Sequence, residues 1–444
     1  MVTTADIRVV NLGRETMKSI YDQLASGRQL KPLVEKIEER IKPVLERVTE
    51  IVLYNQWKVL KAFQEHKVAD FHFAESTGYG YDDVGREVLE KVYATVFGAE
   101  AAIVRPQLIS GTHAIATCLY GLLKAGDELV YITGKPYDTL QTVIGYASAS
   151  PPPGSLKDLG IGYKEVPLNS KGQIDMEGIK EAIGPRTKVV AIQRSRGYAS
   201  RPSFSVGQIG QMVQLVRQIK EDVCIFVDNC YGEFVERLEP TQVGADLMAG
   251  SLIKNPGGGL VKSGGYIVGK QEYVERAATR LFAPGIGMKG GANLNTLLSM
   301  YQGFFLAPHV VGEALKGAIF TAAIMAELGF DVSPSWDEER TDLIQSIRFN
   351  NPEDLLIFCH GIQQASPVNA HVLPQPGPMP GYQDPVVMAA GTFIQGASLE
   401  LSADGPLRPP FLGFVQGGLT YEHVKIGILT ALDGLYKEKH LSFA

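Results

Sequence analysis

Cysteine is scarce in this chain, and the few cysteines are badly placed for metal binding. The 444 residues contain four of them, Cys118, Cys224, Cys230 and Cys359, and no two form a C-x-x-C motif. The eight histidines are scattered, so no cluster supplies the missing ligands of a zinc site. We therefore expect no metal site, and a reducing cytoplasm is the predicted compartment.

The chain also lacks an excess of positive charge and long apolar runs. The formal net charge is −6, which argues against sequence-independent binding of nucleic acid. The first residues have no apolar core of signal-peptide type. The apolar stretch "GAIFTAAIMAELGF" is short and is interrupted by Glu327, so no membrane span is expected. A composition of 45% hydrophobic and 20% charged residues is typical of a folded soluble protein of two or three domains.

What the chain does contain is a change of pattern along its length. Residues 1–70 form a predicted N-terminal helical segment, because apolar residues recur there at intervals of three and four. Residues 71–310 alternate strands with helices, which predicts a large domain with a mostly parallel sheet covered on both faces. Residues 311–444 are predicted to form a smaller C-terminal α/β domain. The fold class is therefore α/β, with functional residues at the carboxyl ends of strands.

Three local features could carry chemistry. Asp228 ends the buried strand "VCIFVD", where it is either a turn cap or the counter-ion of a buried cation. Lys254 stands alone in "GSLIKNPGGG", where it is either a surface lysine or an amine that burial keeps neutral and nucleophilic. The stretch "SGT" at 110–112 opens a helix, either as an ordinary N-cap or as an anion site.

Together the three features match the groups that pyridoxal phosphate needs. The lysine would bind the aldehyde, the aspartate would keep the ring nitrogen protonated, and the helix start would hold the phosphate. A P-loop is excluded in "GGGLVKSGG", because Val261 stands before Lys262 where glycine is required. We find no dinucleotide fingerprint, nucleophile elbow or H-E-x-x-H motif. His113, His309 and His423 are interpreted as structural.

Several longer stretches resemble a known family. "VDNCYGE" followed by "GSLIKN" looks like the fold-type-I pyridoxal-phosphate enzymes of cysteine and methionine metabolism. The stretches "GYGYDDVGREVLEKVYATVFGAE", "RPQLISGTHAIA", "TGKPYDTL", "QRSRGYASRPS" and "GFVQGGLTYEHVKIGILTAL" are similar to the branch called the methionine γ-lyase family, or aluminium-resistance protein. The resemblance covers nearly the whole chain and implies a fold-type-I architecture with pyridoxal 5′-phosphate as cofactor.

The resemblance also implies roles for individual residues. Lys254 would be the Schiff-base lysine, Asp228 the partner of the ring nitrogen, and Tyr137 the tyrosine that stacks on the ring and assists the leaving group. The phosphate contacts that it implies are Ser110, Gly111, Thr112 and Ser251.

Two expected motifs depart from the family pattern. The broader family carries a Tyr-x-Arg motif, contributed by a neighbouring subunit, that contacts the cofactor phosphate. Here "TGYGYDDVGR" offers Tyr79, Tyr81 and Arg86 at a different spacing, and Tyr79 and Tyr81 are the cofactor-binding candidates. For the arginine that binds the substrate carboxylate, Arg408 in "GPLRPPF" is the best candidate and Arg196 in "QRSRGY" is its rival.

The activity that the resemblance implies is a carbon–sulfur lyase acting by β- or γ-elimination. Its substrate would be a sulfur-containing amino acid such as methionine, cystathionine or cysteine. A transferase that performs γ-replacement is the first alternative, and a non-catalytic protein of regulation or metal tolerance is the second. We expect a homodimer or a homotetramer, with no nucleic-acid or membrane partner.

Overall fold

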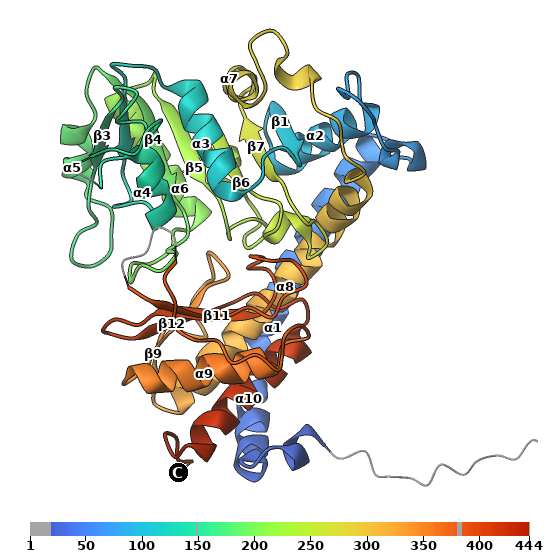
Figure 1. Cartoon of the computed structure of the whole chain (residues 1–444), viewed down its shortest axis with the longest axis vertical. Coiled ribbons are helices and arrows are strands. Elements are labelled where there is room, and N and C mark those ends of the chain that lie inside the picture. Colours follow the sequence, from blue (N-terminus) through green and yellow to red (C-terminus); the bar gives the residue numbers. More distant parts are fainter. Residues whose placement is uncertain (1–18, 148–149, 380–383, 444) are drawn as a thin grey trace, which may run out of the picture.

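The computed structural model describes residues 19–147, 150–379 and 384–443. Its helices are α1 (Gly27–Glu65), α2 (Val84–Phe97), α3 (Gly111–Leu122), α4 (Asp138–Ile144), α5 (Met176–Ala182), α6 (Val206–Ile219), α7 (Gln271–Leu281), α8 (Leu297–Glu327), α9 (Pro352–Gln364) and α10 (Tyr421–Lys437). Its strands are β1 (Ala101–Arg105), β2 (Glu128–Tyr131), β3 (Gly162–Glu165), β4 (Thr187–Gln193), β5 (Cys224–Asp228), β6 (Leu247–Ser251), β7 (Gly265–Gly269), β8 (Asp331–Ser333), β9 (Gln345–Arg348), β10 (Val386–Ala389), β11 (Ser402–Pro406) and β12 (Leu412–Gln416). Figure 1 shows the larger sheet above the smaller one.

The larger sheet has seven strands in the order β1-β7-β6-β5-β4-β2-β3. Its pairs are parallel from β3 to β6, and β7 runs antiparallel to both of its neighbours. Helices cover both faces: one core joins the strands to α3, α4 and α7, and the other joins them to α2 and α6. The mostly parallel α/β sheet expected from the sequence is confirmed.

Successive residues of each central strand enter these two cores alternately. In β5, for example, Ile225 and Val227 belong to one core and Cys224 and Phe226 to the other. This period of two follows from the pleat of a strand. Because both faces are covered, the strand appears in the sequence as a continuous apolar run rather than as an alternating one. The polar Asp228 at its end is therefore conspicuous.

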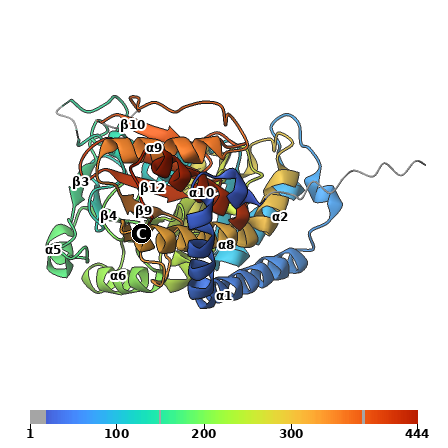
Figure 2. The ribbon, with the colours of Figure 1, turned by 90° about the horizontal axis from the view of Figure 1, so that it is seen from below.

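The smaller sheet has five strands in the order β10-β11-β12-β9-β8, and every pair is antiparallel. Helix α9 packs against β10 and β11, and α10 packs against α9. Figure 1 shows these strands lying between the larger sheet and α9, so one face of the smaller sheet is turned toward the larger domain. Figure 2 shows α9 and α10 side by side beneath the sheet.

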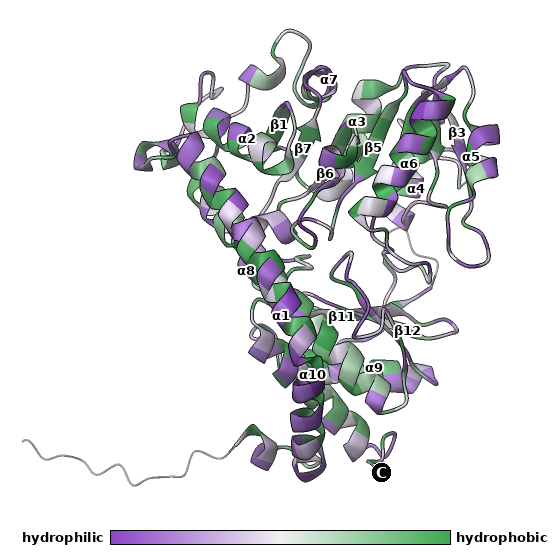
Figure 3. Ribbon diagram, turned by 180° about the vertical axis from the view of Figure 1, so that it is seen from behind, coloured by the Kyte–Doolittle hydropathy of each residue, from purple (hydrophilic) through white to green (hydrophobic). Residues whose placement is uncertain are grey.

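Two long helices, α1 and α8, run together beside both sheets. In α1 the buried residues include Leu30, Val34, Ile37 and Ile41, whose spacing of three and four places them on one face. Figure 3 shows hydrophilic and hydrophobic patches alternating along this helix. Within the helical segment expected at 1–70, the structure has one continuous helix of 39 residues, preceded by a short 3₁₀ turn at Ile20–Gln23; residues 1–18 of that segment lie outside the described residues.

Helix α8 qualifies the expectation that no segment could span a membrane. By length and composition it meets the test for a membrane-spanning helix, and within the described residues it is the one helix that does. Its most apolar window is, however, 83% buried inside the protein. Burial of this extent is what the core helix of a folded domain shows.

Candidate active site

The site lies at the carboxyl ends of two neighbouring strands. Strand β5 ends at Asp228, and the parallel strand β6 ends at Ser251, with Asp228 paired to Ala249. Lys254 follows β6 by three residues and precedes a short 3₁₀ turn, Asn255–Gly257. Asp228, Ser251 and Lys254 all line one pocket of about 480 Å³. Parallel pairing therefore brings together residues that are 26 positions apart in the sequence.

Asp228 is a buried carboxylate with a local hydrogen bond. It is 4% exposed, and its Oδ1 accepts a hydrogen bond from the Cys230 amide at 3.2 Å. Burial raises the pKa of Asp228, and the nearby Lys254 opposes that rise. The carboxylate and the lysine thus line one pocket and influence each other's charge.

Lys254 is more basic than its sequence context suggested. Its Nζ lies 4.0 Å from the ring centroid of Tyr231, a cation–π contact. Burial alone lowers the pKa of Lys254, but Cys230, Tyr231, Asp228 and Tyr137 outweigh it, and the pKa rises above its usual value. The sequence predicts that desolvation favours the neutral amine, and in the structure the acidic groups around Lys254 oppose that effect.

The first turn of α3 forms another side of the pocket. Ser110 caps the helix, since its Oγ accepts a hydrogen bond from the His113 amide at 3.1 Å. Gly111 is closely packed: a Cβ there would lie 3.2 Å from Cys230 Sγ and 3.3 Å from the Ser251 Cβ, which is tighter than an ordinary contact. The helix N-terminus therefore fits closely against the ends of β5 and β6, and a helix start of this kind favours anions.

Tyr137 lies beside this helix start. Its hydroxyl is 2.9 Å from Thr112 Oγ1, and its amide donates to Gln193 Oε1 at 2.9 Å. Burial raises the pKa of Tyr137, Asp228 adds to the rise, and the hydrogen bond with Thr112 opposes it. The hydroxyl therefore keeps its proton and can donate a hydrogen bond into the pocket.

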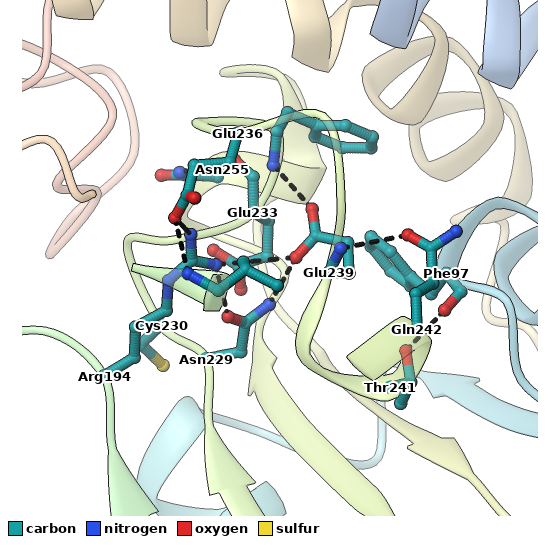
Figure 4. A network of polar contacts seen from close by, with 12 residues as sticks. Phe97, Arg194, Asn229, Cys230, Glu233, Glu236, Glu239, Thr241, Gln242 and Asn255 are labelled. Carbon is teal, nitrogen blue, oxygen red and sulfur yellow. Dashed lines mark hydrogen bonds and ion pairs between the residues drawn. The ribbon is translucent and has the colours of Figure 1, made fainter. Parts of the chain in front are cut away.

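A polar network holds the residue that follows Asp228 (Figure 4). Arg194 Nη1 donates to Asn229 Oδ1 at 2.8 Å, and Asn229 Nδ2 donates to Glu239 Oε2 at 3.0 Å. Glu239 Oε1 accepts from the Phe234 amide at 2.9 Å. A second carboxylate, Glu236, accepts from Arg194 Nη2 at 2.7 Å. The backbone at the end of β5 is thus anchored on the side away from the pocket.

The structure places the two candidate arginines differently. Arg408 lines the pocket and pairs with Asp384 at 2.9 Å, and its side chain is 48% exposed. Arg196 also lines the pocket, but its guanidinium donates to Ser333 and Ser346 of the smaller sheet at 3.2–3.3 Å. Arg408 has the exposed guanidinium, whereas Arg196 links the two domains.

The two tyrosines near residue 80 lie outside the pocket of this chain. Tyr79 and Tyr81 are 77% and 52% exposed, and their ring centroids are 5.6 Å apart. Arg86 is buried, and it donates to the carbonyls of Gly80, Gly291 and Lys289. This arginine therefore fixes the loop that presents the two tyrosines to solvent.

Sequence reasoning missed several pocket residues that come from loops and from the smaller sheet. Tyr231 follows β5, and its positive φ of 72° places its ring beneath Lys254. Asp404 and Gln416 belong to β11 and β12, and Tyr198 follows β4. Tyr231 lies within the quoted motif "VDNCYGE", so its nearness to Asp228 was a usable signal. Asp404 and Gln416 had no local signal, because long-range folding brings them to the pocket.

The described residues, 19–147, 150–379 and 384–443, contain no group of three or more His, Cys, Asp or Glu side chains able to hold a metal ion. The residues around the pocket do fit pyridoxal phosphate. The start of α3, which favours anions, lines the same pocket as the Lys254 amine and the Asp228 carboxylate.

Residues 30–436 match the methionine γ-lyase family. The chain belongs to that family. Since the match covers most of the described chain, the protein is an enzyme of the lyase class, and the family implies pyridoxal phosphate as its cofactor.

Solved structures agree with this assignment. A *Listeria monocytogenes* protein, provisionally named a cystathionine β-lyase involved in aluminium resistance, is 59% identical with a TM-score of 0.89, covering 91% of this chain and 99% of its own. A *Clostridium novyi* protein named a carbon–sulfur lyase involved in aluminium resistance is 46% identical with a TM-score of 0.88, covering 93% and 97%. The pyridoxal-5′-phosphate-dependent protein YhfS of *Escherichia coli*, 17% identical with a TM-score of 0.59, covers 88% and 97% and shares the fold.

Proposed function

We propose that this member of the methionine γ-lyase family is a pyridoxal-phosphate-dependent lyase that cleaves a carbon–sulfur bond in a sulfur-containing amino acid. The observation that carries the proposal is that Lys254, Asp228 and the start of α3 all line one pocket of about 480 Å³. A pocket of this volume is of the size that small-molecule sites occupy. The names of the *Listeria* and *Clostridium* relatives support the same reaction class.

Pyridoxal phosphate, when bound, supplies an aldehyde for an amine and a ring that draws electrons from the substrate's α carbon. The chain offers a partner for each part of it. Lys254 would hold the aldehyde carbon, Asp228 the ring nitrogen, and Tyr137 the face of the ring. The groups that would hold the phosphate are Ser110, Gly111, Thr112 and Ser251.

The remaining chemistry is proton transfer, and two residues of the pocket suit it. The Lys254 amine, once substrate has taken its place, is the base for the proton on the α carbon. Tyr137 keeps its phenolic proton, because burial raises its pKa, so it can donate a hydrogen bond to the departing sulfur.

Arg408 is the proposed partner of the substrate's α-carboxylate. Its guanidinium is exposed on the pocket wall, and its ion pair with Asp384 is itself partly exposed. An exposed pair is worth little, so a carboxylate can replace Asp384 at small cost. Arg196 is the less suitable arginine, because Ser333 and Ser346 already occupy its guanidinium.

An assay of thiol and keto-acid release from methionine, homocysteine, cystathionine and cysteine tests the proposal. The wild type should release both products from at least one of them, and Lys254→Ala should lose this activity at least about a thousandfold. Lys262→Ala, which changes an exposed lysine of the same loop, is the matched control and should keep wild-type activity. A wild type that turns over none of the four would overturn the proposal and favour a non-catalytic role. Adding a thiol acceptor separates γ-replacement from elimination.

We further propose that the enzyme is at least a homodimer and works in the cytoplasm. Tyr79 and Tyr81 are exposed here and outside the pocket, which suits residues that serve a second copy. On α1, the exposed apolar residues Leu53 and Trp57 offer a surface that association would cover. All four cysteines are free and buried, in keeping with a reducing compartment. Sedimentation of a fully active monomer would contradict the dimer.

A further inference from the structure

The wall of the pocket that the smaller sheet contributes carries an unexpected acid. In β11, residues alternate between the two faces of the strand. Ala403 enters the hydrophobic core, and its carbonyl accepts from Cys359 of α9. Ser402 and Asp404 point the other way and line the pocket, together with Gln416 of the neighbouring strand β12. The sheet therefore presents polar groups to the space that holds Lys254.

Asp404 is buried without being fully paired. It is 3% exposed, and Oδ2 accepts a hydrogen bond from Gln416 Nε2 at 3.1 Å. Its Oδ1 has no hydrogen-bond partner among the residues that the structure describes. Burial raises the pKa of Asp404 to about 7, and hydrogen bonds from Tyr198 and Gln416 offset only part of that rise. A buried carboxylate oxygen without a donor is costly, and such groups in folded proteins call for a functional explanation.

The position of Asp404 relative to the reaction centre follows from Tyr231. Lys254 lies over the ring of Tyr231 at 4.0 Å. Burial raises the pKa of Tyr231, Lys254 and Ser398 oppose the rise, and Asp404 adds to it. Lys254, Tyr231 and Asp404 all line the same pocket of about 480 Å³. A substrate whose reacting carbon lies beside Lys254 can therefore extend its other half along this pocket to Asp404.

We propose that Asp404 determines specificity by receiving a protonated amino group on the leaving-group half of a thioether substrate. The inference rests on the proposed function and names its substrate class: an amino acid whose sulfur carries a second, amino-bearing arm. The substrate's own α-amino group is held at Lys254, so an ammonium at Asp404 must come from this arm. Methionine carries only a methyl group on its sulfur and would leave Asp404 Oδ1 unpaired. A site built to bond a polar group rejects a ligand that lacks this group strongly.

Two unreactive ligands that differ only in the second amino group test this assignment. L,L-diaminosuberate and L-aminosuberate both carry a methylene in place of the sulfur, so neither has a leaving group. Equilibrium binding to the holoenzyme is measured by calorimetry. The wild type should bind diaminosuberate about 10- to 100-fold more tightly, because a hydrogen bond to a charged group is gained. Asp404→Asn should bind the two ligands within about threefold of each other.

Matched controls separate this role from a structural one. Asp331→Asn changes an exposed carboxylate of the same sheet and should keep the full wild-type preference. Asp404→Asn should bind aminosuberate about as well as the wild type does. Equal binding of the two ligands by the wild type, which requires no variant, would overturn the assignment and leave the lyase proposal standing. An equal weakening of both ligands in Asp404→Asn would also overturn it. Binding of neither ligand would overturn the assignment of Asp404, whereas the lyase proposal is decided separately by the assay of product release.

Discussion

Two buried acidic groups near the pocket are treated in opposite ways by the fold. Behind the end of β5, Glu239 uses one oxygen for the Phe234 amide and the other for Asn229. On the smaller sheet, Asp404 pairs one oxygen with Gln416, and the other has no partner among the described residues. Both carboxylates are almost fully buried, so exposure does not explain the difference.

Glu239 and Asp404 show how a buried carboxylate that stabilises the fold differs from one that is available to bind a ligand. A buried polar network whose hydrogen bonds are all made fixes the chain, here at Asn229 beside Asp228. It leaves no free hydrogen-bonding group for a ligand. An incompletely satisfied carboxylate destabilises the protein on its own, and such a cost is common where binding requires it. The first group should therefore matter for stability and the second for selectivity.

The largest expected loss of stability comes from the satisfied network. Glu239→Gln would put an amide N–H₂ among the donors Arg194 and Asn229 and leave Arg194 without one of its two carboxylates. We expect a loss of about 3 to 5 kcal/mol, since breaking a buried ion pair strands a charge. Urea unfolding measures it, with the exposed Glu272→Gln as a control that should stay within about 0.5 kcal/mol. Equal stability of Glu239→Gln and wild type would refute the structural role.

Asp228→Asn should separate activity from folding. The neutral amide cannot stabilise a protonated ring nitrogen, so we expect kcat to fall at least about a hundredfold. Stability should not fall, because burial raises the pKa of Asp228 and the charge is unfavourable in the folded protein. The control is Asp222→Asn, an exposed carboxylate that should leave kcat unchanged. A kcat within threefold of wild type would contradict the role given to Asp228.

Asp404→Asn should stabilise the protein, and the gain should depend on pH. The pKa of Asp404 in the folded chain is about 7, above its ordinary value of 3.8, so folding favours the protonated form. This contribution is fully present below about pH 4 and is lost as pH rises toward 7. The variant should therefore match the wild type in free energy of unfolding near pH 4 and exceed it at pH 8 by on the order of 2–4 kcal/mol. A variant less stable than wild type at pH 8 would make Asp404 a structural residue.

Arg408→Gln should have the smallest effect on stability and act on substrate binding. Its ion pair with Asp384 is partly exposed, so unfolding should change by less than about 1 kcal/mol. KM for the preferred substrate should rise about 10- to 100-fold, because a charged hydrogen bond to the carboxylate is lost. Arg348→Gln, on an exposed pair of the smaller sheet, is the control. An unchanged KM would point to another arginine, with Arg196 the first to examine.

The sequence revealed the part of the site that local patterns encode. Asp228 and Ser251 end apolar strands, and the alternation of strands with helices implies that such ends meet at one edge of a parallel sheet. Ser110 opens a helix, and that also follows from residues close in the chain. The strand ends, the helix start and Lys254 were therefore predicted from the sequence, and they line one pocket.

The rest of the site depends on long-range packing. Asp404 stands in "SADGP", where the glycine and proline favour a turn over a strand. Antiparallel pairing of β11 with β10 and β12 brings it to the pocket, and no local pattern shows that pairing. The surroundings of Lys254 also depend on long-range packing, because Tyr137 reaches the same pocket from a distant part of the sequence.

The central claim is that Lys254 carries the cofactor, and covalent labelling tests it most directly. Purified holoenzyme is reduced with borohydride, digested, and its peptides are sequenced by mass spectrometry. We predict one pyridoxyl adduct, on the peptide that contains Lys254, and no adduct in Lys254→Ala. An adduct on Lys135 or Lys262 instead, or a wild type that takes up pyridoxal phosphate without any reducible attachment, would contradict the account.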